Sequence, residues 1–162
     1  MARARRTARV LPSARRLIGS LRDLGYGTPE AVADLVDNSL AAGAHNVDIT
    51  IEFDGSDSWL RISDDGSGMN ASTITEAMRY GTERSYEADD LGKFGLGLKT
   101  ASMSQCRSLT VASRVSKTTA RVEVRQLDLD YVEDYNTWDV LILGAGETVS
   151  YTHLTLPTIY SV

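Results

Sequence analysis

Residues 34–40 read DLVDNSL, and they lie in a segment with the pattern of an amphipathic helix. The helix is predicted to start at Thr28, where a hydroxyl cap is followed by proline and an acid, and Gly43 is its natural stop. Asp34 and Asn38 are four residues apart, so both project from one face. A carboxylate there can accept a proton from water, and an amide oxygen one turn on can coordinate Mg²⁺, which seeks oxygen ligands. Alone, the pair also fits the solvent face of an amphipathic helix.

A second polar patch, DDGSGM at residues 64–69, follows an expected strand. At the end of a strand, the Asp64 carboxylate can accept a hydrogen bond from an exocyclic amine such as that of adenine. Gly66 and Gly68 let the backbone approach a flat ligand closely. An acidic turn is the simpler interpretation of this patch alone. A calcium loop fits poorly, because the EF-hand spacing and its closing glutamate are absent.

The third patch is GKFGLGLK, residues 92–99, where a later helix is expected to begin. It lacks the Gly-Lys-Ser/Thr of a Walker A loop, and it does not follow a first strand as a dinucleotide-binding fingerprint does. Three glycines at a helix start leave free backbone N–H groups, which together with the helix dipole favour phosphate. Lys99 can add a positive charge beside a phosphate. Alone, the patch also fits a flexible loop that enters a packing helix.

The order of the three patches is more specific than any one of them. The chain carries, in this order, an acid-x3-Asn on a helix, an Asp-x-Gly-x-Gly after a strand and a Gly-x2-Gly-x-Gly at a later helix start. This ordered set resembles the GHKL superfamily. The superfamily includes gyrase B subunits, the ninety-kilodalton heat-shock chaperones, histidine kinases, MutL and MORC proteins. The resemblance covers roughly residues 13–130, and LVDNSLAAGA at residues 35–44 is particularly close to the MutL and MORC pattern. It implies an α+β fold, a two-layer α/β sandwich of the Bergerat (histidine kinase-like ATPase) type.

The resemblance also implies ATP and Mg²⁺ as ligands, with a role for each matching residue. Asp34 would stand where the family usually has the glutamate that activates water, Asn38 would ligate Mg²⁺, and Asp64 would hold the adenine amine. Gly66, Gly68 and Met69 would line the base pocket. The phosphates would be wrapped by Gly92, Gly95 and Gly97, with Lys93 and Lys99 nearby. Gly81 and Thr82 would begin a lid.

The chain departs from the family pattern at three places. Asp34 is one methylene shorter than glutamate, so the water is held less well, and a displacement near ~1 Å can cost about 10²-fold in rate. Ala41 stands where close relatives often carry Asp, so one polar contact is expected to be missing. A threonine-bearing strand near the end of the domain is not evident, and Thr137 is its candidate.

Three functions stay open on these grounds. The first is slow ATP hydrolysis that drives lid closure and ATP-dependent homodimerisation, through missing regions, of a larger GHKL protein. The second is a nucleotide-binding module without hydrolysis, which the short Asp34 side chain keeps open. The third is a histidine-kinase-type phosphotransfer domain, and the acid at position 34 speaks against it, since such kinases usually lack a water-activating carboxylate there.

Periodicity predicts the elements around the patches. The expected helices are residues 13–24, 28–42, 72–78 and 95–105, and the expected strands are 47–53, 59–62, 109–113, 120–129 and 140–143. The expected apolar side of the second helix holds Val32, Leu35, Val36 and Leu40. Alternation in residues 47–53 predicts a half-buried strand, and the polar, glycine-bearing residues 80–93 predict a mobile loop.

The length and composition fit one globular domain, with 162 residues of which 42% are hydrophobic and 24% charged. We interpret residues 1–12 as a basic tail, 13–148 as a GHKL ATP-binding domain that is incomplete at its C-terminal end, and 149–162 as a tail that is non-native. Seven arginines and no acid lie in residues 1–22, where a solvated tail entering a first helix is the favoured interpretation.

The charge and apolar patterns bound the partners. The other 140 residues carry ten basic and 22 acidic side chains, a net charge of −12, which argues against a broad nucleic-acid surface on this domain. Nucleic acid remains open as a partner of the full-length parent. No run of 18 apolar residues occurs, so no membrane partner is expected. The single cysteine, Cys106, fits a reducing compartment, and we expect a cytoplasmic protein.

Overall fold

The structure is a computed structural model, and it describes residues 8, 10–23, 27–79, 97–115 and 121–144. The helices are α1 (Ala14–Arg22), α2 (Thr28–Ala41), α3 (Ala71–Ala77), α4 (Gly97–Gln105) and α5 (Leu129–Tyr135), with a short 3₁₀ turn η1 (Gly55–Asp57). The strands are β1 (Val47–Glu52), β2 (Trp59–Asp64), β3 (Ser108–Ser113), β4 (Glu123–Asp128) and β5 (Leu141–Leu143). Residues 80–93 and 149–162, for which a loop and a tail were expected, lie outside the described part of the chain, as do the first two residues of the helix expected at 95–105.

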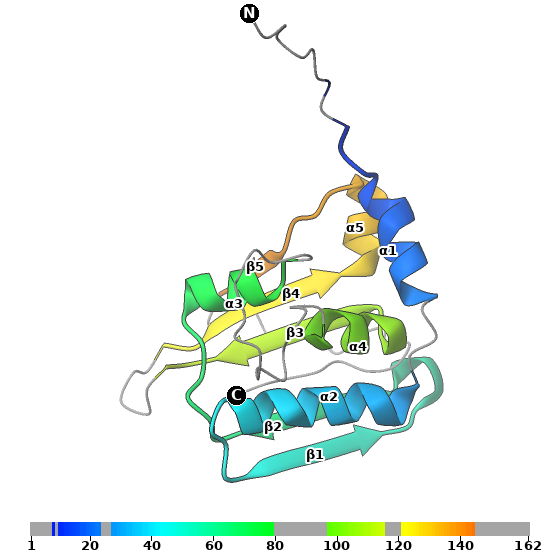
Figure 1. Ribbon diagram of the computed structural model, residues 1–162. Coiled ribbons are helices and arrows are strands. Elements are labelled where there is room, and N and C mark those ends of the chain that lie inside the picture. The colour runs from blue at the N-terminus through cyan, green and yellow to red at the C-terminus, as the bar shows by residue number, and fades with distance from the viewer. Residues whose placement is uncertain (1–7, 9, 24–26, 80–96, 116–120, 145–162) are drawn as a thin grey trace, which may run out of the picture.

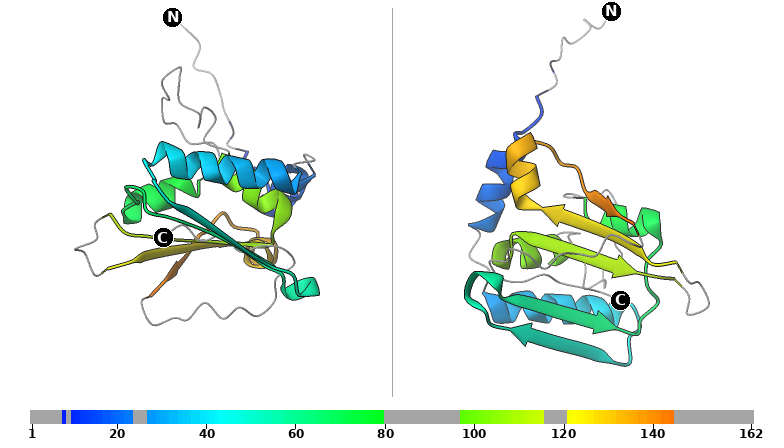
Figure 2. Two further views of the ribbon diagram at one scale, coloured as in Figure 1. Left: turned by 90° about the horizontal axis from the view of Figure 1, so that it is seen from below. Right: turned by 180° about the vertical axis from the view of Figure 1, so that it is seen from behind.

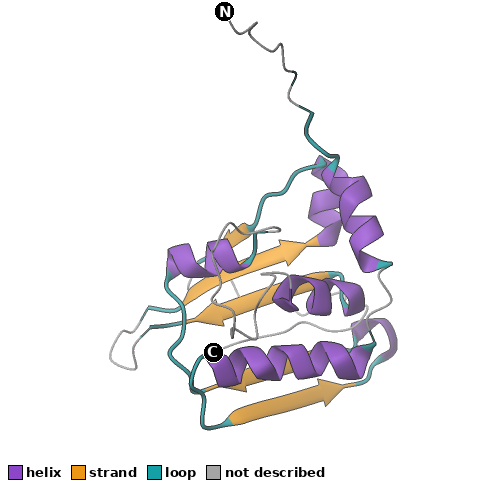
Figure 3. Ribbon diagram, in the orientation of Figure 1, coloured by secondary structure: helices purple, strands orange, loops and turns teal. Residues whose placement is uncertain are grey.

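Helices and strands form two layers (Figures 1 and 3). The strands make an antiparallel hairpin, β1–β2, and an antiparallel sheet in the order β3–β4–β5. The two sheets lie side by side, with β2 next to β3 (Figures 1 and 2). The helix α2 contacts β2, α4 contacts β3 and α3 contacts β4, so helices cover one face of the strands. This arrangement confirms the expected α+β, two-layer sandwich.

The core lies between the two layers, and its buried apolar side chains come from the five helices and from β2, β3 and β4. Each of Ile62 on β2, Ile74 on α3, Leu109 on β3 and Leu127 on β4 is at most 2% exposed. Burial of apolar side chains from both layers is the main favourable term that holds such a sandwich together.

The buried side of α2 differs from the apolar side expected from the sequence. Ala31, Leu35 and Ser39 are buried, whereas Leu40 is 56% exposed and the two valines, Val32 and Val36, are only half-buried. Alanine and serine are small, so α2 can lie close to β2, and the serine hydroxyl finds a polar partner there. The expected stripe was therefore rotated away from the actual one.

The half-buried strand expected at residues 47–53 is β1, but its apolar side is largely exposed. Ile49 pairs with Ile62 and Ile51 pairs with Leu60, so the four side chains share one face of the hairpin. Ile62 and Leu60 are buried, whereas Ile49 and Ile51 are 45% and 49% exposed. The reason is that α2 lies over β2, while β1 lies at the outer edge of the strand layer (Figure 1).

The ends of α2 match the prediction at one end only. Gly43 follows the helix with a φ of 76°, as expected of a glycine at a helix stop. Gly27 occupies the cap position at the start, so the expected role of Thr28 as the cap was wrong. Thr28 is instead the first helical residue, and its hydroxyl donates to Oε1 of Gln105 at 2.6 Å.

The sequence did not predict α5. Only its first residue, Leu129, lies in the strand expected at residues 120–129, and no element was expected for the rest. The strand β4 ends at Asp128, whose carboxylate accepts a hydrogen bond from the backbone N–H of Tyr131 at 2.9 Å and caps the helix. Thr137, the candidate for a threonine-bearing strand, lies between α5 and β5 and donates to Asp139 at 2.8 Å. It therefore does not belong to a strand.

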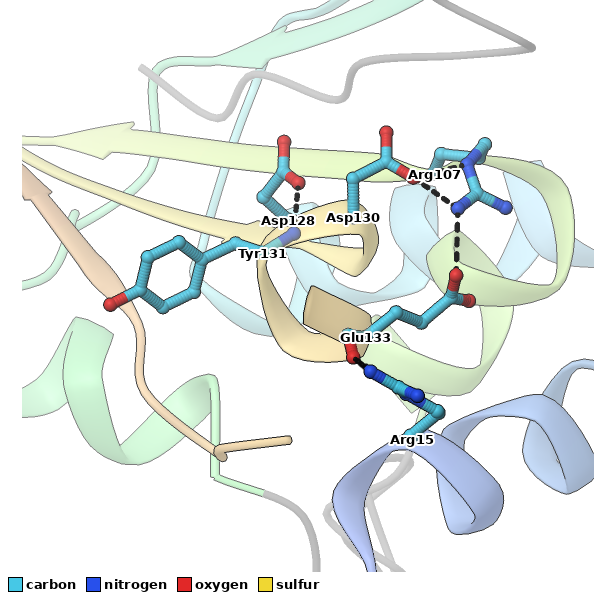
Figure 4. Close-up of polar contacts among 6 residues, drawn as sticks. All are labelled: Arg15, Arg107, Asp128, Asp130, Tyr131 and Glu133. Carbon is cyan, nitrogen blue, oxygen red and sulfur yellow. Dashed lines mark hydrogen bonds and ion pairs between the residues drawn. The ribbon is translucent and has the colours of Figure 1, made fainter. Parts of the chain in front are cut away.

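The first helix, α1, is attached to α5 by polar contacts. Arg15 donates to the backbone carbonyl of Glu133, while the Glu133 carboxylate pairs with Arg107, which also pairs with Asp130 (Figure 4). The Ser13 hydroxyl donates to the side-chain oxygen of Asn136 at 2.8 Å. Since α1 also contacts α4, it braces two elements of the helical layer.

Within the described residues, no helix combines the length and apolarity needed to cross a membrane.

Candidate functional site

The first of the three patches lies on α2. Asp34 and Asn38 are one turn apart in the helix, next to the buried side formed by Ala31, Leu35 and Ser39. Asp34 is half-buried and Asn38 is exposed. A carboxylate and an amide therefore stand on the same side of α2, as the four-residue spacing predicted.

The second patch begins at Asp64, the last residue of β2, and it is tied directly to α2. The Ser39 hydroxyl lies 3.0 Å from Oδ2 of Asp64, and the backbone N–H of Gly66 donates to Oδ1 at 2.9 Å. The backbone N–H of Ser67 donates to the carbonyl of Ala42, just after α2, at 2.9 Å. The structure thus brings the first two patches together, with Asp64 half-buried between them.

Packing alone accounts for the two glycines of this loop, Gly66 and Gly68, and their contact with a ligand stays a prediction. A Cβ at Gly66 would lie 2.9 Å from the Asp64 carboxylate and 3.0 Å from the side chain of Ala42. Gly68 has a φ of 68°, and a Cβ there would overlap the carbonyl of Arg114. The loop therefore needs glycine at both positions to fit between the end of α2 and the end of β3.

Met69 follows these glycines and is anchored to β3. Its backbone N–H donates to the Ser113 hydroxyl at 2.8 Å, and its half-buried side chain packs against the core. A role for Met69 in a base pocket stays a prediction.

The third patch is described only from Gly97 onward. Gly97 is the first residue of α4, and Lys99 belongs to its first turn. The other predicted residues of the phosphate loop and of the lid lie outside the described residues: Gly81, Thr82, Gly92, Lys93 and Gly95.

The start of α4 can nevertheless be placed relative to α2. The two helices pack along each other (Figure 1), and the bond between Thr28 and Gln105 joins the start of α2 to the end of α4, so they run antiparallel. Eight residues back from Gln105 to Gly97 cover about 12 Å, the same rise as eight residues forward from Thr28 to Val36. The start of α4 is therefore about level with the turn of α2 that carries Asp34 and Asn38.

Asp65 follows Asp64, the residue predicted to bind adenine, and it has a structural role. Its carboxylate accepts hydrogen bonds from the backbone N–H and side-chain amide of Asn46 at 2.9 and 2.8 Å, and from the backbone N–H of His45 at 2.7 Å. These bonds hold the pKa of the Asp65 carboxyl well below its ordinary value of 3.8, and the bond from the Asn46 backbone has the largest effect. They also fasten the start of β1 to the end of β2.

The sequence prediction missed two residues that hold this site together, Ser39 and Ser113. Ser39 could have been found, because it continues the four-residue spacing of Ala31 and Leu35 and directly follows Asn38. Ser113 has no local signal, since its partner, Met69, lies 44 residues away.

The residues around Asn38 fit a magnesium ion that is held mainly by nucleotide phosphates. Among the described residues, no three side chains of His, Cys, Asp or Glu are grouped as a metal site. A magnesium ion bound through nucleotide phosphates does not need such a group, because the phosphates and waters supply most of its oxygen ligands. One exposed amide oxygen on α2 is compatible with that arrangement.

Comparison with known proteins agrees with this geometry. A family model described as histidine kinase-, DNA gyrase B-, and HSP90-like ATPase matches residues 26–155. The chain belongs to this family. As a family member it is a GHKL ATP-binding domain, and the resemblance stated from the three patches is confirmed.

Several relatives share the name DNA mismatch repair protein MutL. The protein from Pseudomonas putida (strain W619) is 32% identical over 105 residues, which are 63% of this chain and 16% of the relative. The protein from Shewanella denitrificans is 38% identical over 107 residues, 60% of this chain and 16% of the relative. That from Shewanella woodyi is 40% identical over 93 residues, 54% of this chain and 15% of the relative. The chain thus spans about one sixth of the length of these relatives, and its GHKL domain is MutL-like; the likeness to MORC proteins stays a prediction.

Proposed function

We propose that this chain binds ATP together with Mg²⁺ and hydrolyses the ATP slowly, as one domain of a larger protein. One observation supports this most: α2 carries the first patch, is hydrogen-bonded to the second, and comes level with the start of the third. Its Ser39 bonds to Asp64, its Asp34 and Asn38 share one side, and the start of α4 comes level with their turn. The helix is thus common to residues that are far apart in the sequence.

Adenine recognition is assigned to the second patch. The Asp64 carboxylate would accept a hydrogen bond from the adenine amine, and Gly66, Gly68 and Met69 would line the base. The support is that Asp64 is half-buried and oriented by two donors, so its direction is set before a ligand arrives.

The phosphates are assigned to the start of α4 and the residues before it. The first backbone N–H groups of a helix have no partners within the helix, so those at Gly97 can donate to phosphate oxygens. Gly92 and Gly95 would extend this cradle, with Lys93 and Lys99 as positive charges. Asn38 would ligate Mg²⁺, which when bound neutralises phosphate charge.

Hydrolysis is assigned to Asp34. Its carboxylate would orient a water and accept its proton while the water oxygen bonds to the terminal phosphorus and the bond from that phosphorus to the ADP oxygen breaks. Binding without hydrolysis is the second candidate, and the observation that favours it is the shortness of Asp34 relative to glutamate.

Properties of the whole protein extend this proposal. A lid that begins at Gly81 and Thr82 would close over ATP, and this closure would lead to dimerisation of the parent protein. The relatives named for DNA mismatch repair make nucleic acid a partner to test on the parent. A cytoplasmic location is proposed on the single cysteine and the use of ATP.

Calorimetric titration with a non-hydrolysable ATP analogue, with and without Mg²⁺, tests the proposal on the 162-residue chain. We expect Mg²⁺-dependent binding in the wild type and a loss of about 100-fold or more in Asn38→Ala, since even residues that only support a metal ligand are worth 10–100-fold. Asp37→Ala is the matched control, an exposed residue next in sequence that should bind as the wild type does. Equal affinity in Asn38→Ala and the wild type would remove the metal role, and no binding by the wild type would refute the proposed function.

A further inference from the structure

Ser39 is a polar residue on the otherwise apolar buried side of α2. It is 5% exposed and continues the spacing of Ala31 and Leu35. A buried hydroxyl without a partner is costly, so a serine is tolerated there because its hydroxyl makes a hydrogen bond.

The Ser39 hydroxyl has one proton and two acceptors within reach. Its oxygen lies 3.4 Å from the carbonyl of Leu35 and 3.0 Å from Oδ2 of Asp64. The shorter distance and the charge of the carboxylate favour Asp64, because hydrogen bonds to charged groups are the stronger ones. Ser39 therefore joins α2 to the end of β2 across 25 residues.

The other oxygen of Asp64 is held from a different direction. The backbone N–H of Gly66 donates to Oδ1 at 2.9 Å, and the loop that carries Gly66 is held to the end of α2 by the bond from Ser67 to Ala42. Two donors on two oxygens fix the rotation of the carboxylate.

We propose that Ser39 is a positioning residue for base recognition. It orients Asp64 so that the carboxylate accepts from the 6-amino group of a purine, and it makes the site select a nucleotide that carries this group. This inference rests on the proposed role of Asp64 in ATP binding. Because Asn38 and Ser39 are neighbours on α2, one helix then positions both the metal ligand and the base ligand.

The test compares two nucleotides in the 162-residue chain: ATP and purine riboside triphosphate, which lacks the 6-amino group. With Mg²⁺ present, we expect the wild type to prefer ATP by about 100-fold and Ser39→Ala to prefer it by about tenfold, since one charge-assisted hydrogen bond is worth roughly one order of magnitude. Ser39→Cys keeps a weak donor of similar size and should give an intermediate preference. It carries the comparison if Ser39→Ala does not fold.

The matched control is Ser58→Ala, which removes another buried serine hydroxyl, 3% exposed and bonded to the Gly55 carbonyl. It should lower the melting temperature and keep the wild-type preference. A merely structural role for Ser39 would weaken both nucleotides equally, and an unchanged preference in Ser39→Ala would overturn the inference while leaving ATP binding intact. A wild type that binds neither nucleotide would refute the proposed function itself, and the positioning role with it.

Discussion

Gly68 lies against Arg114 so closely that a Cβ atom on the glycine would overlap the Arg114 carbonyl oxygen. The same Cβ would lie 3.2 Å from the hydroxyl of Ser113, which accepts the backbone N–H of Met69. The loop that follows Asp64 is therefore pressed onto the end of β3 at one end and onto α2 at the other. The distance between α2 and β3 is thus set partly by this loop.

Gly68→Ala should destabilise the protein by about 2–4 kcal/mol. The φ of 68° is unfavourable for alanine, and the overlapping atom belongs to the backbone, which cannot rotate away. Urea unfolding followed by circular dichroism measures the change. The control, Gly19→Ala in α1, introduces the same methyl group into open space and should stabilise by about 0.5–1 kcal/mol, because alanine favours a helix. Similar effects of the two substitutions would show that the close contact at Gly68 is unimportant.

Asp34→Asn should bind ATP as the wild type does but hydrolyse it at least about 100-fold more slowly, because the amide cannot accept the water proton. Asp34→Glu restores the length usual in the family and should hydrolyse faster, by about tenfold or more. Phosphate release under saturating ATP and Mg²⁺ measures both rates. Asp37→Asn, an exposed neighbour on α2, serves as the control with an unchanged rate. Hydrolysis that survives in Asp34→Asn would show that another group activates the water.

Asn136 should control the attachment of α1 to α5. It ends α5 with a φ of 49°, and its side-chain oxygen accepts the Ser13 hydroxyl at 2.8 Å and the Arg15 backbone N–H at 3.2 Å. Asn136→Gly keeps the left-handed backbone but removes both bonds, so we expect a loss of about 1–2 kcal/mol. Hydrogen exchange should show faster opening of α1 amides, while those of β3 change little. Unchanged exchange in α1 would mean that apolar packing of Ile18, which is fully buried, suffices to hold the helix.

Asp65 should make the stability depend on acid pH. Its pKa is lower in the folded protein than its ordinary value of 3.8, so the bonds from His45 and Asn46 stabilise the fold above that pH and lose their contribution as the pH falls below it. Urea unfolding at about pH 3 and about pH 6 should show a smaller difference for Asp65→Asn than for the wild type. Asp48→Asn removes a nearby exposed carboxylate on β1 without touching these bonds, and it should keep most of the wild-type difference. The same pH dependence in Asp65→Asn and the wild type would contradict this assignment.

Much of the candidate site followed from local spacing alone. The four-residue interval between Asp34 and Asn38 placed both on one side of α2, and the order of the three patches indicated the family that the comparison confirmed. The stop at Gly43 followed from the ease with which glycine takes a positive φ. Such features depend on a helix or a turn only, and neighbouring residues encode them.

The contacts between elements could not be predicted from local spacing, because they depend on the tertiary structure. Whether Ile49 or Ile62 is buried depends on which strand of the hairpin α2 covers, and both have the same alternating pattern in the sequence. The bonds from Ser39 to Asp64 and from Met69 to Ser113 span 25 and 44 residues, and they exist only because two layers pack at one particular distance. That distance is set by the summed volumes of many side chains in the core, which no single stretch of the sequence contains.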